Sequence, residues 1–503
     1  MLRAVAALAA TLAVCGTLAA RAPDRTPVER TLDSLFFAGR YDTLRIILPP
    51  LIHAAEARGD SAALGRLAFQ KGRVEITLGH QSIASNDLDR AVRLTDASRD
   101  SLWLCAALHF KAFILRDSGN PDAAMALFER ELEIGRLARL PGAEGAAVSN
   151  LAYKELRRGN LDAARRGYAR MQALYRQSGN TYQIAGAGLS MGLLYRALGD
   201  IDSCRWSYHE TLRLARQYRY PMHELWALNN IGLMDMDTGN WESAASCFEG
   251  ALAIGRRIGF DRGQALPLMN LSLAWSYLGE GERSQRAIDE AVEVCRRAGF
   301  KDLEVGNTNV LAKLNLDAGR NRQAAALYRT IVRQDVFNRL QRSEAAYGLA
   351  LALAGMDSVG AGLEVLEPFV SPRVETPDFT VQAFFEMAFA ELLYRDGQYQ
   401  EALDRAIRLR DEMDRSGRTD LGVAARLLES SCRRSLGDGE RAAGALSLAL
   451  DSLEVARTDI GNAEWREAYG QHVMGDVIEG CRVMLVHPSD APREERVRRF
   501  YDT

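Results

Sequence analysis

The side chains that most often carry catalysis or hold metals are present in this sequence, but their spacing suits neither role. The seven histidines form no H-E-x-x-H motif and no other pair four residues apart, the spacing that aims two imidazoles of one helix at a metal. There is no glycine-rich phosphate loop, G-x-G-x-x-G fingerprint or G-x-S-x-G elbow. We therefore expect no enzyme activity, no catalytic residue, no metal and no cofactor.

Two local features only superficially suggest a reactive centre. Cys432 follows two serines, yet the first of them, Ser430, falls on a packing position of the repeat described below, so we interpret Cys432 as structural. Asp235 and Asp237 are interpreted as a solvated or groove-edge face rather than an acid–base pair. The cysteines after Cys15 lie far apart without a C-x-x-C pair, which favours buried thiols over zinc or disulfides.

A second group of polar side chains is suited to binding. Asn150, Asn230 and Asn270 occupy one position of a recurring pattern, and Asn229 precedes Asn230. An asparagine amide offers a donor and an acceptor together, so it can pair with an extended peptide backbone of any sequence. The same helical stripe carries Tyr153, Arg157, Arg196 and Lys313. The alternative is that these asparagines bond the adjacent helix and stiffen the stack.

The elements that would position these residues are set by a glycine repeat. Glycines recur every 40 residues at 39, 79, 119, 159, 199, 239, 279 and 319, and the series continues at 355, 397 and 437. Asn or Asp follows several of them, as expected where a helix ends in a tight turn. The spacing predicts that each glycine ends one helix and begins a tight connection to the next.

The flanks of each glycine agree with this interpretation. Seven residues earlier stands a small residue, for example Gly232 or Ser272, and five residues later usually an alanine such as Ala244. Nine residues later comes an aromatic residue in five of the repeats, Phe248 among them. Small residues at fixed positions on two consecutive helices allow their backbones to approach, and the aromatic is expected to fill the gap to the neighbouring pair.

This pattern resembles the tetratricopeptide repeat (TPR), in its longer form of about forty residues, and the stretch from Trp226 to Phe260 shows it well. The resemblance extends from about residue 24 to 458, roughly eleven repeats. It implies a right-handed superhelix whose first helices line a concave groove, with each repeat contacting only its neighbours. It also implies a docking surface for peptides or proteins, in which Asn150, Asn230 and Asn270 contact the ligand.

The start of the chain is typical of a secretory signal peptide. A cationic start precedes an apolar stretch from Ala4 to Val14, too short to span a bilayer, and small residues follow. We expect export from the bacterial cytoplasm to the periplasm or envelope. Two processing routes stay open: cleavage after Ala20, or lipidation of Cys15, because Leu12 to Cys15 resembles a lipobox from which Val14 departs.

Length and charge limit the function classes. The chain has 503 residues, too many for one compact domain, and 47% of them are apolar, which excludes wholesale disorder. A formal net charge of −3 without a block of like charges argues against a nucleic-acid partner. The expected partner is a protein or peptide. Arg157 and Arg196 would favour an acidic ligand, and a membrane is expected only through a lipid on Cys15.

The last residues follow a different pattern. Ala463 to Val486 predicts one amphipathic helix, and a charged helix is expected from Arg493 to the last residue. This tail resembles the segment that joins TPR arrays to the CHAT domain, a caspase-like peptidase, though none of that domain's His or Cys motifs occurs. The alternative to a scaffold is thus the regulatory part of a larger CHAT-type peptidase or signalling protein.

Together these features predict an all-α, right-handed superhelical TPR solenoid with a C-terminal helical cap. Residues 1–22 form the signal peptide, 23–458 the TPR array and 459–503 the C-terminal helical segment. A kink is expected near 370–378, where proline and charged residues interrupt the register. The predicted function is a non-catalytic scaffold that binds a peptide or protein partner in the concave groove.

Overall fold

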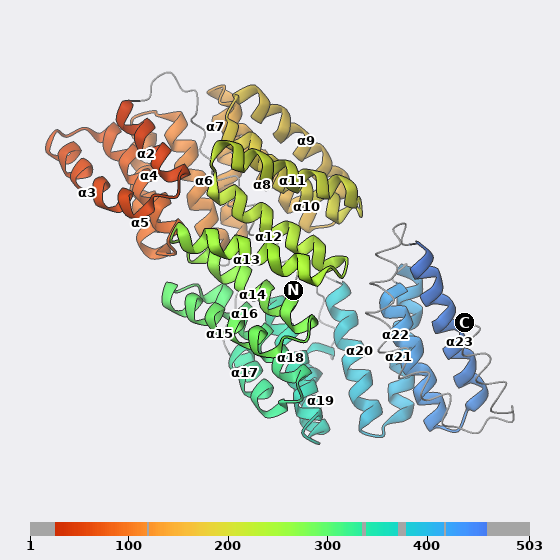
Figure 1. Ribbon diagram of the computed structural model, residues 1–503. Helices are drawn as coiled ribbons and strands as arrows, with labels where there is room; N and C mark the ends of the chain where they lie inside the picture. Colours follow the sequence, from red (N-terminus) through yellow and green to blue (C-terminus); the bar gives the residue numbers. More distant parts are fainter. Residues whose placement is uncertain (1–25, 118–119, 334–338, 371–378, 417–418, 460–503) are drawn as a thin grey trace. The chain divides into compact units, whose positions relative to one another are not determined.

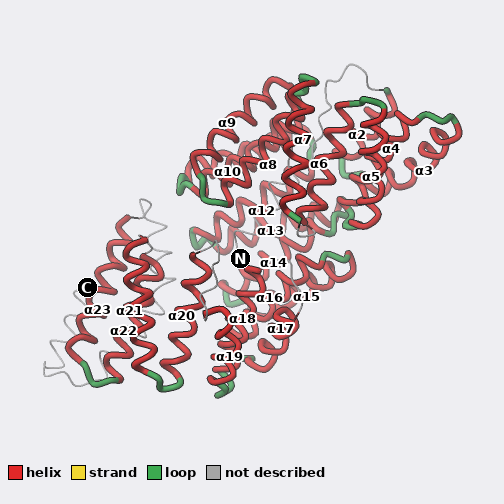
Figure 2. The backbone as a smooth tube through the Cα atoms, turned by 180° about the vertical axis from the view of Figure 1, so that it is seen from behind, coloured by secondary structure: helices red, strands yellow, loops and turns green. Residues whose placement is uncertain are grey.

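The computed structural model describes residues 26–117, 120–333, 339–370, 379–416 and 419–459, and the regular structure in these ranges is entirely helical (Figures 1 and 2). Twenty-two helices follow one another in the described residues, as eleven consecutive pairs. The predicted all-α repeat fold is therefore confirmed. The predicted signal peptide with Cys15, the kink near 370–378 and the C-terminal segment lie outside the described residues, except at the margins of these ranges.

We call the helices of each pair A and B. The A helices of repeats 1 to 11 are α2 (Pro27–Phe37), α4 (Ser61–Thr77), α6 (Ser101–Asp117), α8 (Pro141–Arg157), α10 (Thr181–Ala197), α12 (Pro221–Asp237), α14 (Arg262–Tyr277), α16 (Lys301–Asp317), α18 (Arg339–Ala354), α20 (Phe379–Arg395) and α22 (Thr419–Ser435). The B helices are α3 (Tyr41–Ala57), α5 (Gln81–Ala97), α7 (Pro121–Leu137), α9 (Leu161–Ser178), α11 (Ile201–Tyr218), α13 (Trp241–Arg257), α15 (Gly281–Ala298), α17 (Asn321–Arg333), α19 (Val359–Val370), α21 (Tyr399–Ser416) and α23 (Gly439–Asp459).

The chain divides into two compact units. The N-terminal unit comprises residues 1–236 and 240–307, and the C-terminal unit comprises 237–239 and 308–503. The division falls within α16 of repeat 8. None of the described helices combines the length and the apolar content that crossing a membrane requires.

The predicted turn glycines adopt the conformation that favours glycine. Gly39, Gly79, Gly159, Gly199, Gly239, Gly279, Gly319, Gly397 and Gly437 have φ angles from 71° to 87°. An L side chain is strained in this left-handed region because its Cβ approaches the backbone, whereas glycine has no Cβ. In these nine repeats the A helix therefore ends at a left-handed glycine, which explains the 40-residue spacing.

The ninth turn departs from the prediction. There the left-handed residue is Asp357, with φ 58°, and not Gly355. The small packing positions shift by the same two residues, because a Cβ on Gly362 would stand 2.9 Å from the carbonyl oxygen of Ala350. Gly348, which the spacing had assigned to that position, instead accommodates the ring of Tyr328. Measured from Asp357, the spacing to Gly397 is again 40 residues.

The small residues lie where the two helices of a pair meet. Ser284 Oγ on the B helix donates to the carbonyl oxygen of Ser272 on the A helix at 2.7 Å. Gly232 lies under the ring of Phe248, since a Cβ there would be 2.7 Å from the ring. The predicted close approach is confirmed. Phe248 covers the small residue of its own pair, whereas Tyr328 lies against Gly348 of the next pair, as predicted for the aromatic.

A second series of turns was not apparent from the sequence. The residues that end the B helices, at positions 59, 99, 139, 179, 219, 259 and 299, also have positive φ, from 54° to 72°. Arginine occupies three of these sites: Arg99, Arg139 and Arg219. The N-terminal unit is therefore built from segments of 20 residues, each a helix and a left-handed turn, and the 40-residue repeat is two of them.

The N-terminal unit also coils back on itself. The ring of Phe37, at the end of α2, lies 4.5 Å from the ring of Tyr182 in repeat 5. A Cβ on Gly39 would stand 2.8 Å from Ile258, and one on Gly79 would overlap the ring of Phe300. Repeats 1 and 2 thus touch repeats 5 to 7, so the expectation that each repeat contacts only its neighbours is wrong for this unit.

Candidate functional site

The A helices of the N-terminal unit are interior elements. In α12, 14 of 17 residues are buried, including residues on every face of the helix. In the B helix α15 only 7 of 18 residues are buried, and they form one stripe. Polar residues of the A helices therefore lie inside the array, where each donor and acceptor needs a partner. The predicted groove residues are examples.

Three of the predicted asparagines lie close to one another. Asn229 and Asn230 of α12 are 0% and 2% exposed, and Asn270 of α14 is 0% exposed. Asn270 Nδ2 donates to Asn229 Oδ1 at 2.9 Å and so joins the two A helices. Asn150 differs, because its Nδ2 donates at 3.0 Å to the carbonyl oxygen of Ala146 in its own helix. The helix-to-helix bond of the stiffening alternative is thus present at one pair.

Several polar atoms beside this pair have no partner. Within the described residues, both amide atoms of Asn230, Nδ2 of Asn229, Oδ1 of Asn270 and Nε1 of Trp226 are buried without a hydrogen bond. We call these four residues the asparagine cluster. A buried polar group without a partner costs about 1–3 kcal/mol, so the cluster can be stabilised by any group that supplies donors and acceptors.

The other predicted site residues are spread over three A helices. Tyr153 of α8 and Arg196 of α10 are half-buried. Lys313 of α16 is exposed and pairs with Asp317 at 2.6 Å, one turn further along its own helix, in the C-terminal unit. The side chain of Arg157 lies outside the described residues. Within the predicted set, a hydrogen bond joins Asn270 to Asn229.

Two buried polar residues escaped the sequence reasoning. Gln183 Nε2 donates to the carbonyl oxygen of Gly142 at 3.1 Å, and His223 Nε2 donates to that of Tyr182 at 2.9 Å. Both residues stand 16 positions before their turn glycine and reach the preceding A helix. Burial lowers the pKa of His223 to about 4. Their 40-residue spacing within apolar helices was the available signal.

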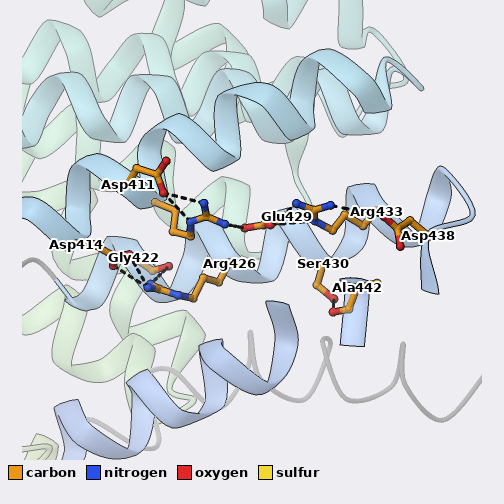
Figure 3. Close-up of polar contacts among 10 residues, drawn as sticks. Asp411, Asp414, Gly422, Arg426, Glu429, Ser430, Arg433, Asp438 and Ala442 are labelled. Carbon is orange, nitrogen blue, oxygen red and sulfur yellow. Dashed lines mark hydrogen bonds and ion pairs between the residues drawn. The ribbon is translucent and has the colours of Figure 1, made fainter. Parts of the chain in front are cut away.

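Buried ion pairs join helices in both units. His109 Nδ1 lies 2.8 Å from Glu131 Oε2 between α6 and α7, and burial raises the pKa of Glu131 although His109 opposes the shift. In the C-terminal unit, Glu429 is 3% exposed and accepts from Arg410 at 2.5 Å and Arg433 at 2.9 Å (Figure 3). The His109–Glu131 and Arg410–Glu429 pairs connect consecutive helices, whereas Arg433 and Glu429 lie one turn apart in α22.

The remaining candidates for chemistry have structural environments. Cys432 is 0% exposed, and burial, with the nearby Glu429 carboxylate, raises the pKa of its thiol to about 12. Ser430 Oγ donates to the carbonyl oxygen of Ala442 at 2.8 Å (Figure 3), the packing role predicted for it. In the described part of the chain, no three His, Cys, Asp or Glu residues lie close enough together to hold a metal ion.

The comparison with known families agrees with the helix-pair geometry. Residues 225–258, which include the turn at Gly239 and most of the asparagine cluster, match the family model of the tetratricopeptide repeat. The chain is a TPR-type helical repeat protein. Within this TPR array, the matched repeat is the one whose A helix, α12, carries Trp226, Asn229 and Asn230.

Solved structures similar to this TPR protein share 13% sequence identity with it. The match to the apo form of RapI includes 59% of this chain and 100% of the RapI chain, with a TM-score of 0.36. The apo form of the quorum sensor NprR from B. thuringiensis covers 72% and 99% (TM-score 0.49), and NprR in complex with its cognate peptide NprX covers 65% and 97% (0.40). At 13% sequence identity, these similarities give no information on the ligand of this chain. No curated protein matches the sequence.

Proposed function

We propose that this protein is a non-catalytic scaffold that binds an extended peptide, or an extended segment of a partner protein, along its A helices. The observation that carries the proposal is a set of unpaired amide atoms, those of Asn229 and Asn230 inside the matched TPR and that of Asn270 in the following repeat. Their donors and acceptors match the N–H and C=O groups of an extended backbone. Trp226, four residues before Asn230 in α12, adds a buried indole N–H that also has no partner.

Ligand entry requires a local opening of the array, because the cluster side chains are at most 2% exposed. Separating α12 from α14 breaks the contacts of two repeats and leaves the other helices folded, so it costs less than unfolding the chain. The ligand repays part of this cost by satisfying amide groups that have no partner in the closed form. Binding is therefore expected to be slow relative to binding on an open surface.

The proposed ligand is a protein or a peptide, with acidic groups favoured by Arg157 and Arg196, and not a nucleic acid. We further propose that the protein is exported, with its N-terminal segment removed through at least Val14. An intact-mass spectrum of the native protein tests this point. An acyl group on Cys15 identifies lipoprotein processing, an N-terminus after Ala20 identifies plain secretion, and retention of Met1 excludes both.

Peptide selection and titration test the binding site. Peptides are selected on the wild-type protein from a random display library, and the best binder is titrated against a variant with Asn229, Asn230 and Asn270 all changed to Ala. Each amide bonded to the ligand contributes about 0.5–1.5 kcal/mol, so this triple variant should bind at least about tenfold more weakly. Asn150→Ala is the matched control, because Asn150 bonds its own helix, and it should bind normally.

Circular dichroism establishes that both variants are folded before titration. If the folded triple variant binds every selected peptide as tightly as the wild type does, the asparagine cluster is not the site. If Asn150→Ala weakens binding as strongly as the triple variant does, removal of any buried amide lowers the affinity. The asparagine cluster is then not a specific site, and the proposal fails as well.

A further inference from the structure

Positive charge is concentrated in one part of the N-terminal unit. Between positions 141 and 220, which form repeats 4 and 5, there are eleven arginines and one lysine but only six acidic residues. The chain as a whole has a net charge of −3, so the rest of it is acidic. This segment contains the B helices α9 and α11, whose outer faces are exposed.

Elsewhere in the N-terminal unit, ion pairs between successive B helices neutralise the outer face. They join residues 34 positions apart in sequence, so that an arginine of one B helix meets a carboxylate of an adjacent B helix. The pairs are Arg90–Glu56 at 2.8 Å, Arg130–Asp96 at 2.7 Å, Arg256–Glu290 at 2.5 Å and Arg283–Glu249 at 3.2 Å. They also show that successive B helices lie side by side.

This series of ion pairs is interrupted at α9. The next position in the series sets Arg170 of α9 against Arg136 of α7, two cations instead of an ion pair. Both arginines turn to a single carboxylate, that of Glu144 in α8, with Arg136 Nε 3.4 Å from Glu144 Oε1. One negative charge therefore serves two positive ones.

The interruption continues on α11. Arg176 stands where it could meet Glu210, but Glu210 instead accepts two hydrogen bonds from Arg213, each of 2.7 Å. Arg216 stands opposite Gly250, which has no side chain to pair with it, and bonds Glu224 of the following A helix. No ion pair among the described residues joins α9 to α11 or α11 to α13.

Exposed cations and aromatic rings share this face. Arg166 and Arg176 of α9, and Arg205 and Arg219 at α11, are exposed, and their guanidinium groups make no hydrogen bond or ion pair with the described residues. Trp206, next to Arg205, is 67% exposed. We call Arg166, Arg170, Arg176, Arg205, Trp206 and Arg219 the basic face. It lies on the outer side of the array, unlike the buried asparagine cluster.

We propose that the basic face binds an acidic segment of a partner protein. Arginine and tryptophan are the residues most enriched at the energetic centres of protein interfaces, and a guanidinium group pairs with a carboxylate through two parallel hydrogen bonds. An exposed indole beside unpaired guanidinium groups provides an apolar anchor within a cationic surface. Complementary charge is therefore the property that identifies this partner.

Two other polyanions fit the surface less well. Asp162, Asp202 and Glu210 lie on the same two helices and would be repelled by the continuous negative charge of an anionic membrane, whereas a protein segment can avoid them. Single-stranded nucleic acid is held by series of stacking aromatic side chains. On the described parts of α9 and α11 the exposed aromatic side chains are Trp206 and Tyr218, which stand 12 positions apart and form no series. The observations therefore favour an acidic protein segment.

Fluorescence anisotropy at low salt tests the proposal with three probes. They are a labelled glutamate-rich peptide with a central phenylalanine, an oligothymidylate of similar length, and vesicles of phosphatidylcholine with phosphatidylglycerol. The peptide should bind saturably, more tightly than the other two, and less tightly as salt rises. Arg166→Glu combined with Arg205→Glu should weaken peptide binding at least about tenfold, and Trp206→Ala should do so by about tenfold.

A matched control uses arginines of other B helices. Arg93 of α5 and Arg257 of α13 are also exposed without a partner in the described residues, so Arg93→Glu with Arg257→Glu makes the same change of net charge elsewhere. This control should bind the peptide within about twofold of wild type. It changes only the long-range electrostatic attraction of the peptide, which salt screens, and removes no contact at the basic face. An equal loss in control and test variants would overturn the proposal, as would tighter binding of the oligonucleotide or the vesicles.

The result is separable from that for the asparagine cluster. The triple asparagine variant keeps the basic face intact and should bind the glutamate-rich peptide normally. If this variant loses the peptide as well, the ligand enters the interior and the basic face is not its site.

Discussion

Asn230 and Asn270 are equally buried but differ in whether their amides have partners. Asn270 donates to Asn229, whereas both amide atoms of Asn230 lack a partner in the described residues. Replacing Asn230 with Leu, a residue of similar size, removes an unsatisfied group, so Asn230→Leu should raise the free energy of unfolding by about 1 kcal/mol. Asn270→Leu should lower it by about 1–3 kcal/mol, because Asn229 then loses its partner.

Urea unfolding of the two variants measures this difference. A gain in stability with a loss of ligand affinity at Asn230→Leu is the pattern of a residue kept for binding. If Asn230→Leu is destabilised as much as Asn270→Leu, the Asn230 amide is satisfied in solution, and the energetic basis of the proposed site is lost.

His223 makes a second prediction at the residue scale, because burial lowers its pKa to about 4 while its ordinary value is near 6.5. Between these pH values the unfolded chain binds a proton at this histidine and the folded chain does not. Its contribution to stability is therefore complete above pH 6.5 and is lost as the pH falls toward 4, by up to about 3 kcal/mol.

The variant His223→Gln isolates this contribution. A glutamine amide can donate to the Tyr182 carbonyl, as Gln183 does to Gly142, and it does not titrate. The urea midpoint of His223→Gln should therefore fall less than that of wild type as the pH drops through this window. The exposed His53, changed to Gln, serves as the control and should follow wild type. Parallel curves for His223→Gln and wild type would contradict the assignment.

The sequence allowed the positions of the site residues to be predicted better than their contacts. Helical spacing located Asn229, Asn230 and Asn270, since a position fixed relative to a turn glycine recurs on the same side of each A helix. Spacing carries no information on which amide finds a partner. Asn270 can reach Asn229 only when α12 and α14 pack at a particular distance and axial offset, which the sequence pattern does not specify. Burial of His223 depended on packing of the same kind.

At the scale of the helix and its turn, Arg139 occupies a conformation that favours glycine. Its φ is 54°, and four of the six equivalent turn positions carry glycine. The left-handed conformation costs an L residue about 1–2 kcal/mol, and glycine loses part of this advantage through the entropy of the unfolded chain. Arg139→Gly should therefore stabilise the protein by about 0.5–1 kcal/mol.

The control for this prediction is a neighbouring C-cap position with ordinary geometry. Arg58 caps α3 with φ −88°, so Arg58→Gly removes no strain and should lower stability by up to about 1 kcal/mol. Differential scanning calorimetry resolves the opposite signs. Equal destabilisation by both changes would mean that Arg139 makes a contact that outweighs its backbone strain.

The same arginines explain why the sequence revealed the 40-residue period but not the 20-residue one. The A-helix turns carry glycine almost throughout, whereas arginine breaks the visible series at the B-helix turns. At the ninth turn, the left-handed position was predicted at Gly355 because glycine occupies it elsewhere, whereas Asp357 adopts that conformation. Aspartate tolerates this region better than most residues do, so composition alone could not decide between them.

At the scale of the whole N-terminal unit, the contacts between repeats 1–2 and repeats 5–7 link regions that are far apart in sequence. Sequence periodicity describes a repeat and its neighbours, and it cannot show where an array returns to itself. Phe37 packs against Tyr182, and its ring centroid lies 6.3 Å from that of Tyr220. Unfolding of this unit should therefore not follow the neighbour-only pattern of a linear array.

The variant Phe37→Ala tests this coupling. Loss of a half-buried ring should cost about 1–3 kcal/mol, and the loss should appear at both partners of the contact. Hydrogen exchange measured by mass spectrometry should show faster exchange in α2 and at the starts of α10 and α12, which are more than 140 residues away from Phe37 in sequence. Repeats 3 and 4, which lie between them in sequence, should exchange at the wild-type rate. Ile46→Ala, at a 74% exposed position of α3, is the control and should alter neither region. If Phe37→Ala accelerates exchange only in repeats 1 and 2, the contact with Tyr182 contributes no coupling, and the N-terminal unit behaves as a linear array after all.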